Sequence, residues 1–240
     1  MSALPAPRDA AVDRAELTAL LRHARALVGV TLAELADGLG LPVPIGHVRT
    51  KGWAGQIIER ELGAGDSGER GPDFAALGVE LKTVPVTEEL VPLESTAVCQ
   101  IDPVAIAAES WASSYARRKL ARVLFVALAV PAGSTVGDRR VAAVSLWQPS
   151  ADEEALLAAD FDGFVTGFFR RGRAAEITGH HGQVLQVRPK GRNAADRRRA
   201  FGPDGQEVQI GKCGFYLRPA FVGRILRVST MLPPPSGTFQ

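Results

Sequence analysis

Two carboxylates and one lysine stand close together between Pro72 and Lys82. Asp73 follows the proline, and Glu80 and Lys82 lie two residues apart in a segment that alternates as a β-strand. Because the side chains of a strand alternate between its faces, Glu80 and Lys82 are expected on the same face. Asp73 is expected to fold back beside Glu80. The sequence therefore predicts that two carboxylates and one ammonium converge at one end of a sheet.

These groups have the chemistry that hydrolysis of a phosphodiester needs. The carboxylates of Asp73 and Glu80, with the backbone carbonyl of Leu81, offer the hard oxygen ligands that suit Mg²⁺. The metal would neutralise charge on the phosphate and lower the pKa of bound water, while Lys82 would hold the attacking water or stabilise the phosphoryl oxygens. The alternative is a solvated edge-strand face, since a D-x(n)-E-x-K pattern also arises by chance.

A further carboxylate is expected from the short helix predicted around residues 53–62, which ends at Gly63. Its apolar periodicity places Glu59 at the margin of the apolar face and Glu61 near the centre of that face. Helical geometry alone leaves open which of the two glutamates faces the metal.

The order of the expected elements is typical of an α/β or α+β protein, with helices followed by a mixed sheet and flanking helices. Capping-box spacings predict helices that open at Asp13, Thr31 and Ser150. Strands are expected at residues 77–85, 93–101, 123–130, 141–147 and 214–217, and a last helix at 219–228. A hairpin that turns at His180-His181-Gly182 is expected within residues 174–187, and a mobile loop at 191–205.

Composition limits the classes of protein to consider. The 240 residues suffice for one large domain or two lobes with a shared core, and 46% hydrophobic with 22% charged residues is typical of a soluble protein. Cys99 and Cys213 are far apart, which disfavours a zinc site or a disulfide framework and fits a reducing cytoplasm. No stretch approaches the roughly 20 apolar residues of a membrane span. Residues 1–12 are interpreted as a flexible arm and 229–240 as a flexible tail.

Charge is unevenly distributed along the chain, although the net charge is only +2. Residues 161–240 hold thirteen Lys and Arg against five Asp and Glu, whereas residues 1–160 hold fifteen against twenty-one. This asymmetry favours a basic surface for a polyanion, joined to a part that carries acidic residues. The alternative is an arginine-rich solvated surface without a nucleic-acid partner.

A series of short motifs follows in a fixed order from about Leu17 to Leu226. They include Lys51-Gly52-Trp53 with Gly55 and Glu59, Asp73-Phe74, Glu80-Leu81-Lys82-Thr83, Pro92-Leu93-Glu94, Val98-Cys99, Lys119-Leu120, Leu146-Trp147, Gln186-Val187-Arg188-Pro189-Lys190 and Gly214-Phe215-Tyr216-Leu217. With these motifs in this order and spacing, the chain resembles the MutH family of mismatch-repair endonucleases.

The resemblance implies a restriction-endonuclease-like α/β fold, a mixed β-sheet flanked by helices, with two lobes around a DNA cleft. The endonuclease domain is then expected at residues 13–228, with the N-lobe at about 13–130 and the C-lobe at about 131–228. The implied activity is Mg²⁺-dependent nicking of the unmethylated strand of double-stranded DNA at hemimethylated GATC sites. MutL would activate nicking after MutS finds a mismatch, and the protein would be a cytoplasmic monomer without membrane attachment.

The resemblance also assigns roles near the predicted metal site. It implies that Asp73, Glu80 and Lys82 are the catalytic set and that Glu59, rather than Glu61, is the accessory carboxylate. Lys119 matches a family lysine near the active site; its alternative role is that of a helix-surface lysine in a basic run.

For DNA reading, the resemblance points to the C-terminal part of the chain. Arg188 can offer a bidentate fork to a guanine edge, Lys190 can anchor a phosphate, and Tyr216 can sense an adenine N6-methyl by steric contact. The alternative for Tyr216 is a core aromatic on a short strand. The complete predicted DNA-binding set is Lys51, Gly52, Arg188, Pro189, Lys190 and Tyr216.

Some positions depart from the family pattern. Ala97 stands where Phe is usual, Gly191-Arg192 stands where small Ala residues are usual, and Glu88-Glu89 adds negative charge after the catalytic strand. Two other functions remain open. One is a restriction enzyme of the same superfamily that cuts both strands at GATC, and the other is a DNA-binding module without catalysis.

Overall fold

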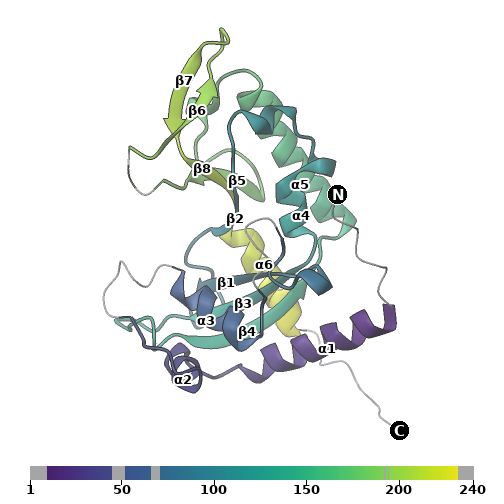
Figure 1. Cartoon of the computed structure of the whole chain (residues 1–240), viewed down its shortest axis with the longest axis vertical. Helices are drawn as coiled ribbons and strands as arrows, with labels where there is room; N and C mark the ends of the chain where they lie inside the picture. Colours follow the sequence, from purple (N-terminus) through teal and green to yellow (C-terminus); the bar gives the residue numbers. More distant parts are fainter. Residues whose placement is uncertain (1–9, 45–51, 66–70, 192, 194, 232–240) are drawn as a thin grey trace. The chain divides into compact units, whose positions relative to one another are not determined.

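The computed structural model describes residues 10–44, 52–65, 71–191, 193 and 195–231, with the backbone alone at 10–11 and 229–231. Its helices are α1 (Ala10–Ala26), α2 (Leu32–Gly38), α3 (Trp53–Glu61), α4 (Tyr115–Leu120), α5 (Ala151–Phe164) and α6 (Pro219–Met231) (Figure 1). Its strands are β1 (Glu80–Val86), β2 (Thr96–Gln100), β3 (Val123–Ala129), β4 (Arg140–Trp147), β5 (Leu185–Pro189), β6 (Arg197–Phe201), β7 (Glu207–Gly211) and β8 (Cys213–Leu217). Several sheets flanked by helices confirm the predicted α/β class.

The chain forms two compact units that interleave along the sequence. The first comprises residues 1–90, 124–146 and 229–240, and the second comprises residues 91–123 and 147–228. The predicted division near residue 130 is therefore not where the two units separate. The chain leaves the first unit after Leu90, returns to it with β3 and β4, and leaves it again after Leu146. A boundary in sequence cannot describe this arrangement, because β1 and β3 are neighbours in one sheet although 36 residues, 87–122, lie between them.

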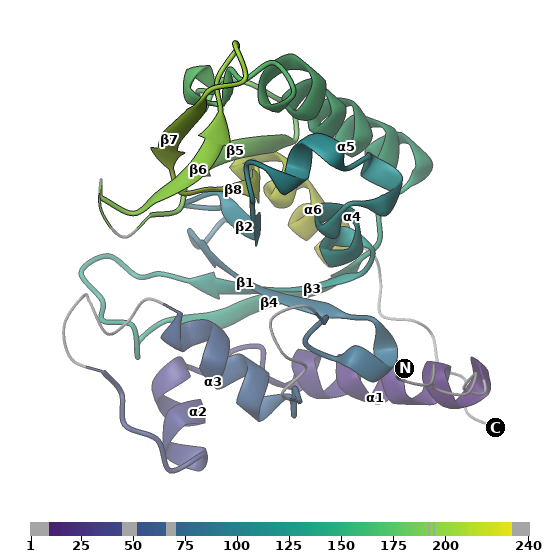
Figure 2. The same ribbon diagram turned by 45° about the horizontal axis from the view of Figure 1, so that its top comes forward.

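The first unit is built on a sheet with the strand order β1-β3-β4. All seven residues of β3 are buried, as expected for an apolar central strand. Helices α1, α2 and α3 lie together on one face of this sheet (Figure 2). The chain between α1 and α2 runs along β4, where Gly29 N–H donates to the carbonyl of Val141 at 2.8 Å and Leu32 N–H to that of Arg139 at 2.9 Å. These bonds attach the helical layer to the sheet.

The second unit is built on an antiparallel sheet with the order β2-β8-β5. One face is apolar and packs on α5, where the Phe215 ring lies 5.4 Å from that of Phe161 and 6.1 Å from that of Phe164. Strands β6 and β7 form a separate antiparallel hairpin in the same unit. The opposite face of this sheet carries polar residues, among them Gln186, Arg188 and Tyr216.

Several helix boundaries follow the predicted caps. Thr31 and Ser150 are N-caps, and each forms a complete capping box with the glutamate three residues later. Helix α5 continues through a π-helical turn to Phe169. The prediction that a helix opens at Asp13 is wrong, because α1 already begins at Ala10, within the stretch interpreted as a flexible arm. Helix α6 also continues past Val228 to Met231, into the stretch interpreted as a tail.

The predicted hairpin at residues 174–187 is wrong. Residues 174–176 form a short 3₁₀ helix, and only Leu185–Pro189 is a strand, paired with β8 rather than with the preceding segment. The cause is Asp160 on α5, whose buried carboxylate accepts the N–H groups of Gln183, Val184 and Leu185 at 2.7–2.9 Å. Because these N–H groups bond to a side chain, they are not available to a hairpin partner.

The predicted loop at residues 191–205 contains strand β6, which pairs with β7. On one face of this hairpin Ala200 and Ile210 are buried, and on the other Arg197, Arg199 and Phe201 are exposed. The arginines therefore occupy the solvent face of a true strand. Polar composition alone suggested a loop, because the apolar residues of this strand are few and small.

Two predicted strands are shorter than expected. Strand β1 begins at Glu80 rather than at residue 77, since a 3₁₀ turn occupies Ala75–Leu77. Strand β2 is confined to Thr96–Gln100. Among the described residues, no helix has the length and apolar character needed to cross a membrane.

Candidate active site and nucleic-acid interface

A tight loop before β1 brings Asp73 beside the strand. Phe74 and Val79 exchange backbone hydrogen bonds of 2.9 and 3.3 Å, and Gly78 closes the turn with φ of 62°, a conformation that glycine adopts at little cost. Asp73 is thereby turned back, and its Oδ2 accepts the N–H of Leu81 at 2.7 Å. The expectation that Asp73 folds back beside the strand is confirmed.

Glu80 and Lys82 lie on the same face of β1 and form a hydrogen-bonded ion pair. The Lys82 Nζ donates to Glu80 Oε1 at 2.6 Å, and Glu80 is only 3% exposed. This burial contradicts the alternative of a solvated edge-strand face. A buried carboxylate is costly unless it is paired and hydrogen-bonded, and Lys82 supplies both the charge and the donor. The ion pair fixes the Lys82 ammonium beside the Glu80 carboxylate.

The two glutamates of α3 have different surroundings. Glu61 lies 3.1 Å from Nε2 of His23 on α1, so this carboxylate already has a partner within the helical layer. Burial raises the pKa of the Glu59 carboxyl, the negative charge of Asp73 raises it further, and Lys82 partly opposes the rise. Glu59 therefore belongs electrostatically to the same group as Asp73, Glu80 and Lys82.

Gly55, one turn before Glu59 on α3, has no side chain and so leaves room for the Glu59 carboxylate beside β1. A Cβ on Gly55 would lie 3.6 Å from Glu59 Oε1 and 3.8 Å from the Thr83 hydroxyl. The side of α3 that bears Glu59 therefore lies next to β1 at Thr83. The apolar residues Ala54, Ile57 and Ile58 are buried and fix the helix in this position.

The group as a whole carries an excess of negative charge when ionised, with three carboxylates against one ammonium. Its oxygen donors are of the type that Mg²⁺ prefers, and this cation usually takes one or two carboxylates and completes its shell with water and phosphate oxygens. Within the described ranges, no three His, Cys, Asp or Glu side chains form a ready metal cage. The chemistry of the oxygen donors suits Mg²⁺, and the described side chains do not form a closed structural metal centre.

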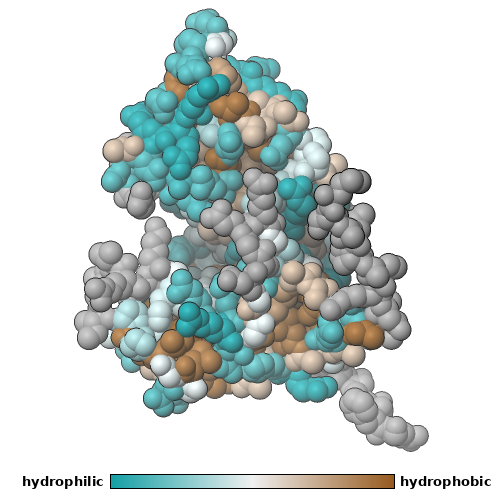
Figure 3. Space-filling model, viewed as in Figure 1, coloured by the Kyte–Doolittle hydropathy of each residue, from teal (hydrophilic) through white to brown (hydrophobic). Residues whose placement is uncertain are grey.

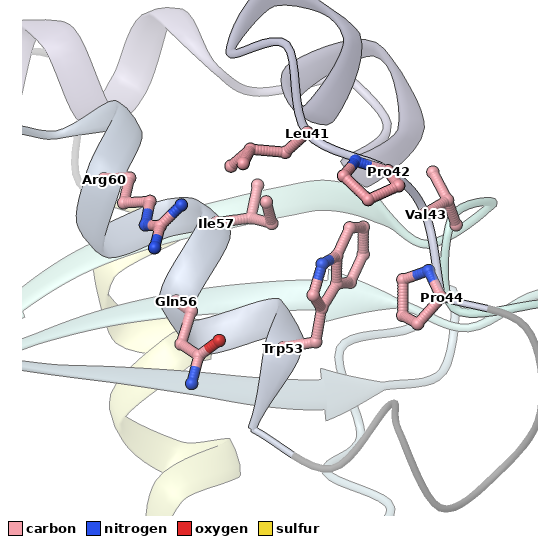
Figure 4. Close-up of a pocket in the computed structure, with 8 residues that line it drawn as sticks. All are labelled: Leu41, Pro42, Val43, Pro44, Trp53, Gln56, Ile57 and Arg60. Carbon is pink, nitrogen blue, oxygen red and sulfur yellow. The ribbon is translucent and has the colours of Figure 1, made fainter.

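Helix α3 also lines a pocket of about 450 Å³, together with the chain that follows α2 (Figure 4). Trp53, Gln56, Ile57 and Arg60 face this pocket from α3, and Leu41 and Pro42 face it from the other wall. None of the described residues that line it is acidic. The pocket is therefore separate in chemistry from the carboxylate group.

In the second unit, the predicted DNA-reading residues lie on the polar face of the sheet β2-β8-β5. Tyr216 on β8 is paired with Ala97 on β2 and with Gln186 on β5, so these three residues form one row across the sheet. Tyr216 is half-buried, and Phe215 and Leu217 on either side of it are the residues that enter the core. The alternative of a core aromatic does not describe Tyr216. Ala97, where the family pattern has Phe, is its direct cross-strand neighbour.

The charge of Arg188 acts on the hydroxyl of Tyr216. Burial raises the pKa of the Tyr216 hydroxyl, the Arg188 guanidinium opposes this rise, and Glu94 adds to it. Nη1 of Arg188 donates to the hydroxyl of Ser95 at 2.9 Å, and Nε2 of Gln186 donates to the same hydroxyl at 2.7 Å. Ser95 and Gln186 were not predicted from the sequence as members of this group. Strand alternation, which puts Gln186 and Arg188 on one face, was the signal that could have found Gln186.

Lys190 follows β5 at the same edge. Its backbone N–H donates to the carbonyl of Lys212 at 2.8 Å, and its Cδ would lie 3.1 Å from a Cβ on Gly214. Gly214 therefore lets the Lys190 side chain lie close across β8. Arg188, Pro189 and Lys190 are all exposed, and the face of this unit seen in Figure 3 is mainly hydrophilic over β6 and β7. These residues are accessible to a large ligand.

The remaining predicted residues have other positions. Lys119 belongs to the second unit, on α4, with its Nζ 5.7 Å from the centre of the Tyr115 ring. Gly52 is the N-cap of α3, with φ of 84°. Lys51 lies outside the described residues, as does Arg192. The roles of Lys119, Gly52 and Lys51 stay predictions.

Comparison with known proteins gives a consistent family. The family model described as "DNA mismatch repair enzyme MutH" matches residues 62–160. The DNA mismatch repair protein MutH of Shewanella amazonensis is 40% identical over 88% of this chain and 94% of its own length. The proteins of the same name from Pectobacterium atrosepticum and Vibrio cholerae are 40% and 38% identical, each over 87% of this chain and over 90% and 94% of their own lengths.

The family match covers part of the candidate site, and helix α3 with Glu59 lies just before its range. Its range includes the loop with Asp73, strand β1 with Glu80 and Lys82, and helix α4 with Lys119. The longer alignments cover most of the chain at an identity that establishes common descent and a common fold. The chain belongs to the MutH family of DNA mismatch repair endonucleases, which have a restriction-endonuclease-like fold.

Proposed function

We propose that this protein is a Mg²⁺-dependent endonuclease that nicks the unmethylated strand of DNA at hemimethylated GATC sites during methyl-directed mismatch repair. The observation that carries the proposal is the group Glu59, Asp73, Glu80 and Lys82 at β1, in a chain of the MutH family. Its excess negative charge suits a divalent cation, and its lysine suits a phosphate.

Each side chain of this group has a task in the proposed reaction. Asp73 and Glu80, with the carbonyl of Leu81, would hold Mg²⁺, and Glu59 would add negative charge and a further oxygen near the ion. When bound, the metal supplies Lewis-acid stabilisation of the charge that develops on the phosphate. In the hydrolysis a bond forms between water oxygen and phosphorus, one phosphorus–oxygen ester bond breaks, and the leaving oxygen takes a proton.

Lys82 is the cation that the chain itself provides. Its ammonium is fixed 2.6 Å from Glu80 Oε1, which supports a role in orienting the attacking water or in stabilising the phosphoryl oxygens. Because Glu80 is buried and Lys82 is half-buried, the charge is partly shielded from water, and there a fixed charge has a larger effect than in bulk solvent. Lys119 is proposed as a second lysine near the reacting phosphate, as the family pattern implies.

Recognition of the site is assigned to the second unit. Arg188 is proposed to contact a guanine edge, Lys190 a phosphate, and Tyr216 the adenine position at which a methyl group would clash. The half-exposed ring of Tyr216 and the exposed guanidinium of Arg188 on one sheet face support this assignment. Lys51, Gly52 and Pro189 are proposed to make further DNA contacts. We also propose MutL as the activator, MutS as the indirect partner that reports the mismatch, a monomeric state, and a cytoplasmic location.

The experiment that separates this function from a double-strand restriction activity uses a circular plasmid with one hemimethylated GATC. Incubation with Mg²⁺ and MutL should convert the supercoiled plasmid to the nicked circle. A linear product formed without MutL would instead identify a restriction enzyme. Plasmid that stays supercoiled in the presence of MutL, while DNA binding is retained, would identify a binding module without catalysis.

A further inference from the structure

The hydroxyl of Ser95 connects two side chains of the polar sheet face. It lies 2.9 Å from Nη1 of Arg188 and 2.7 Å from Nε2 of Gln186. A guanidinium and an amide NH₂ can only donate, so the Ser95 oxygen accepts both bonds and uses both of its lone pairs. Ser95 therefore acts as a common acceptor that fixes Gln186 and Arg188 relative to each other.

Gln186 is buried, although its side chain is polar. It is only 3% exposed and lies two residues before Arg188, on the same face of β5 and opposite Tyr216 on β8. Burying an amide is unfavourable unless it is hydrogen-bonded, so its bond to Ser95 is a requirement of the fold at this point. Because Gln186 is buried, it cannot itself offer its amide to a large ligand, and its effect must pass through Ser95.

Arg188 differs from Gln186 because it is exposed. An exposed arginine samples many rotamers, whereas a bidentate contact to one base edge needs a single orientation of the guanidinium plane. The bond from Nη1 to Ser95 restricts that plane and uses one nitrogen of the fork, so donors remain for a base. A side chain that is already oriented loses less conformational freedom when it binds.

We propose that Ser95 is a positioning residue for DNA reading: its hydroxyl, held by buried Gln186, presets the guanidinium of Arg188 for a bidentate base contact. This inference rests on the proposed function, since it takes Arg188 as a base-reading residue. It predicts that the loss of the hydroxyl weakens sequence discrimination rather than DNA binding in general.

The test measures a specificity ratio with the full chain in the absence of Mg²⁺. The ratio is the dissociation constant for a duplex in which the guanine base pair of GATC is changed, divided by the dissociation constant for the intact hemimethylated site. Arg188→Ala should lower this ratio about tenfold or more, as expected for loss of one bidentate contact. Ser95→Ala should also lower this ratio, by up to about tenfold. Ser95→Thr keeps a hydroxyl and should keep the ratio of the native protein.

Two controls separate positioning from a purely structural effect. Ser113→Ala removes an exposed serine hydroxyl elsewhere in the same unit and should leave the ratio unchanged. Ser95→Ala in the Arg188→Ala background should have no further effect, because the group that Ser95 positions is gone. Thermal unfolding of each variant shows whether the fold is retained.

The outcomes divide clearly. If Arg188→Ala lowers the ratio but Ser95→Ala leaves it unchanged, this inference is overturned and the proposed function stands. It is also overturned if Ser95→Ala lowers the ratio equally with and without Arg188, since that result identifies a structural role. If Arg188→Ala leaves the ratio unchanged, the proposed base-reading role is wrong and the inference is overturned with it.

Discussion

At the scale of single residues, the carboxylate group at β1 depends on which oxygen bonds to which donor. Glu80 is paired with Lys82, Asp73 with the backbone of Leu81, and Glu61 with His23. Strand alternation predicted that Glu80 and Lys82 share a face, because that prediction needs only two residues that lie two positions apart. The separation of Glu59 from Glu61 could not be derived locally, since the partner of Glu61 lies 38 residues earlier, on α1.

Replacement of Glu80 by Gln should abolish nicking while DNA binding is retained. The amide keeps the shape of the side chain but removes a negative charge from the proposed Mg²⁺ site and the ion pair of Lys82, so a loss of about 10³-fold or more is expected. Plasmid nicking and gel-shift binding measure the two effects separately. Glu61→Gln on α3 is the matched control and should retain nearly full nicking. A Glu80→Gln protein with normal nicking would exclude Glu80 from catalysis.

Replacement of Tyr216 by Ser should relax discrimination between methylated and unmethylated strands. Ser is too small to contact a methyl group from this position, and the ring is half-buried in a row with Ala97 and Gln186. Cleavage of fully methylated and unmethylated duplexes, compared as initial rates, measures the effect. Tyr216→Phe keeps the ring and should keep the discrimination. If the Ser variant discriminates as the native protein does, Tyr216 has no part in methyl sensing.

At the scale of secondary-structure elements, the sequence predicted the helices better than the small strands. The capping boxes at Thr31 and Ser150 are local signals and are confirmed. Strands β6 and β5 were misjudged because contacts outside each strand decide its structure. The first is a strand because Ala200 and Ile210 pack on one face, and the second is started by a carboxylate of α5. No local pattern contains these contacts.

Asp160 is therefore expected to be essential for the second unit. The residue is only 8% exposed, and its carboxylate accepts the N–H groups of three consecutive residues that lead into β5. Asp160→Ala leaves these donors without an acceptor and should lower the free energy of unfolding by about 3 kcal/mol. Chemical denaturation measures this quantity. Asp162→Ala, an exposed position on the same helix, should change it by less than about 0.5 kcal/mol. Equal effects of the two variants would contradict the role of Asp160.

At the scale of the whole molecule, the two kinds of predicted functional residue lie in different units. The carboxylate group belongs to the first unit, and the exposed cations Arg188 and Lys190 belong to the second. The charge asymmetry is a property of the sequence, and the two units interleave along the chain. The family resemblance was correct over most of the chain, since many spaced motifs carry more information than one local pattern.

DNA binding should weaken steeply with salt, because cations of the second unit displace counterions from phosphates. Between 50 and 200 mM salt the affinity is expected to fall by about 10³-fold if roughly six phosphates are contacted. Lys190→Ala should reduce the slope of log affinity against log salt by about 1 without changing the preference for GATC. A slope near zero in the native protein would contradict phosphate-dominated binding. Fluorescence anisotropy with a labelled duplex provides both measurements.

Strand selection in the presence of Mg²⁺ tests the central claim most directly. The substrate is a duplex with one GATC, methylated on a single strand, with a different dye on each strand, and it is incubated with MutL. We expect cleavage of the unmethylated strand alone, a switch to the other strand when the methyl group is moved, and no cleavage with EDTA. Equal cutting of both strands, cutting of the methylated strand, or cleavage that persists with EDTA would contradict it.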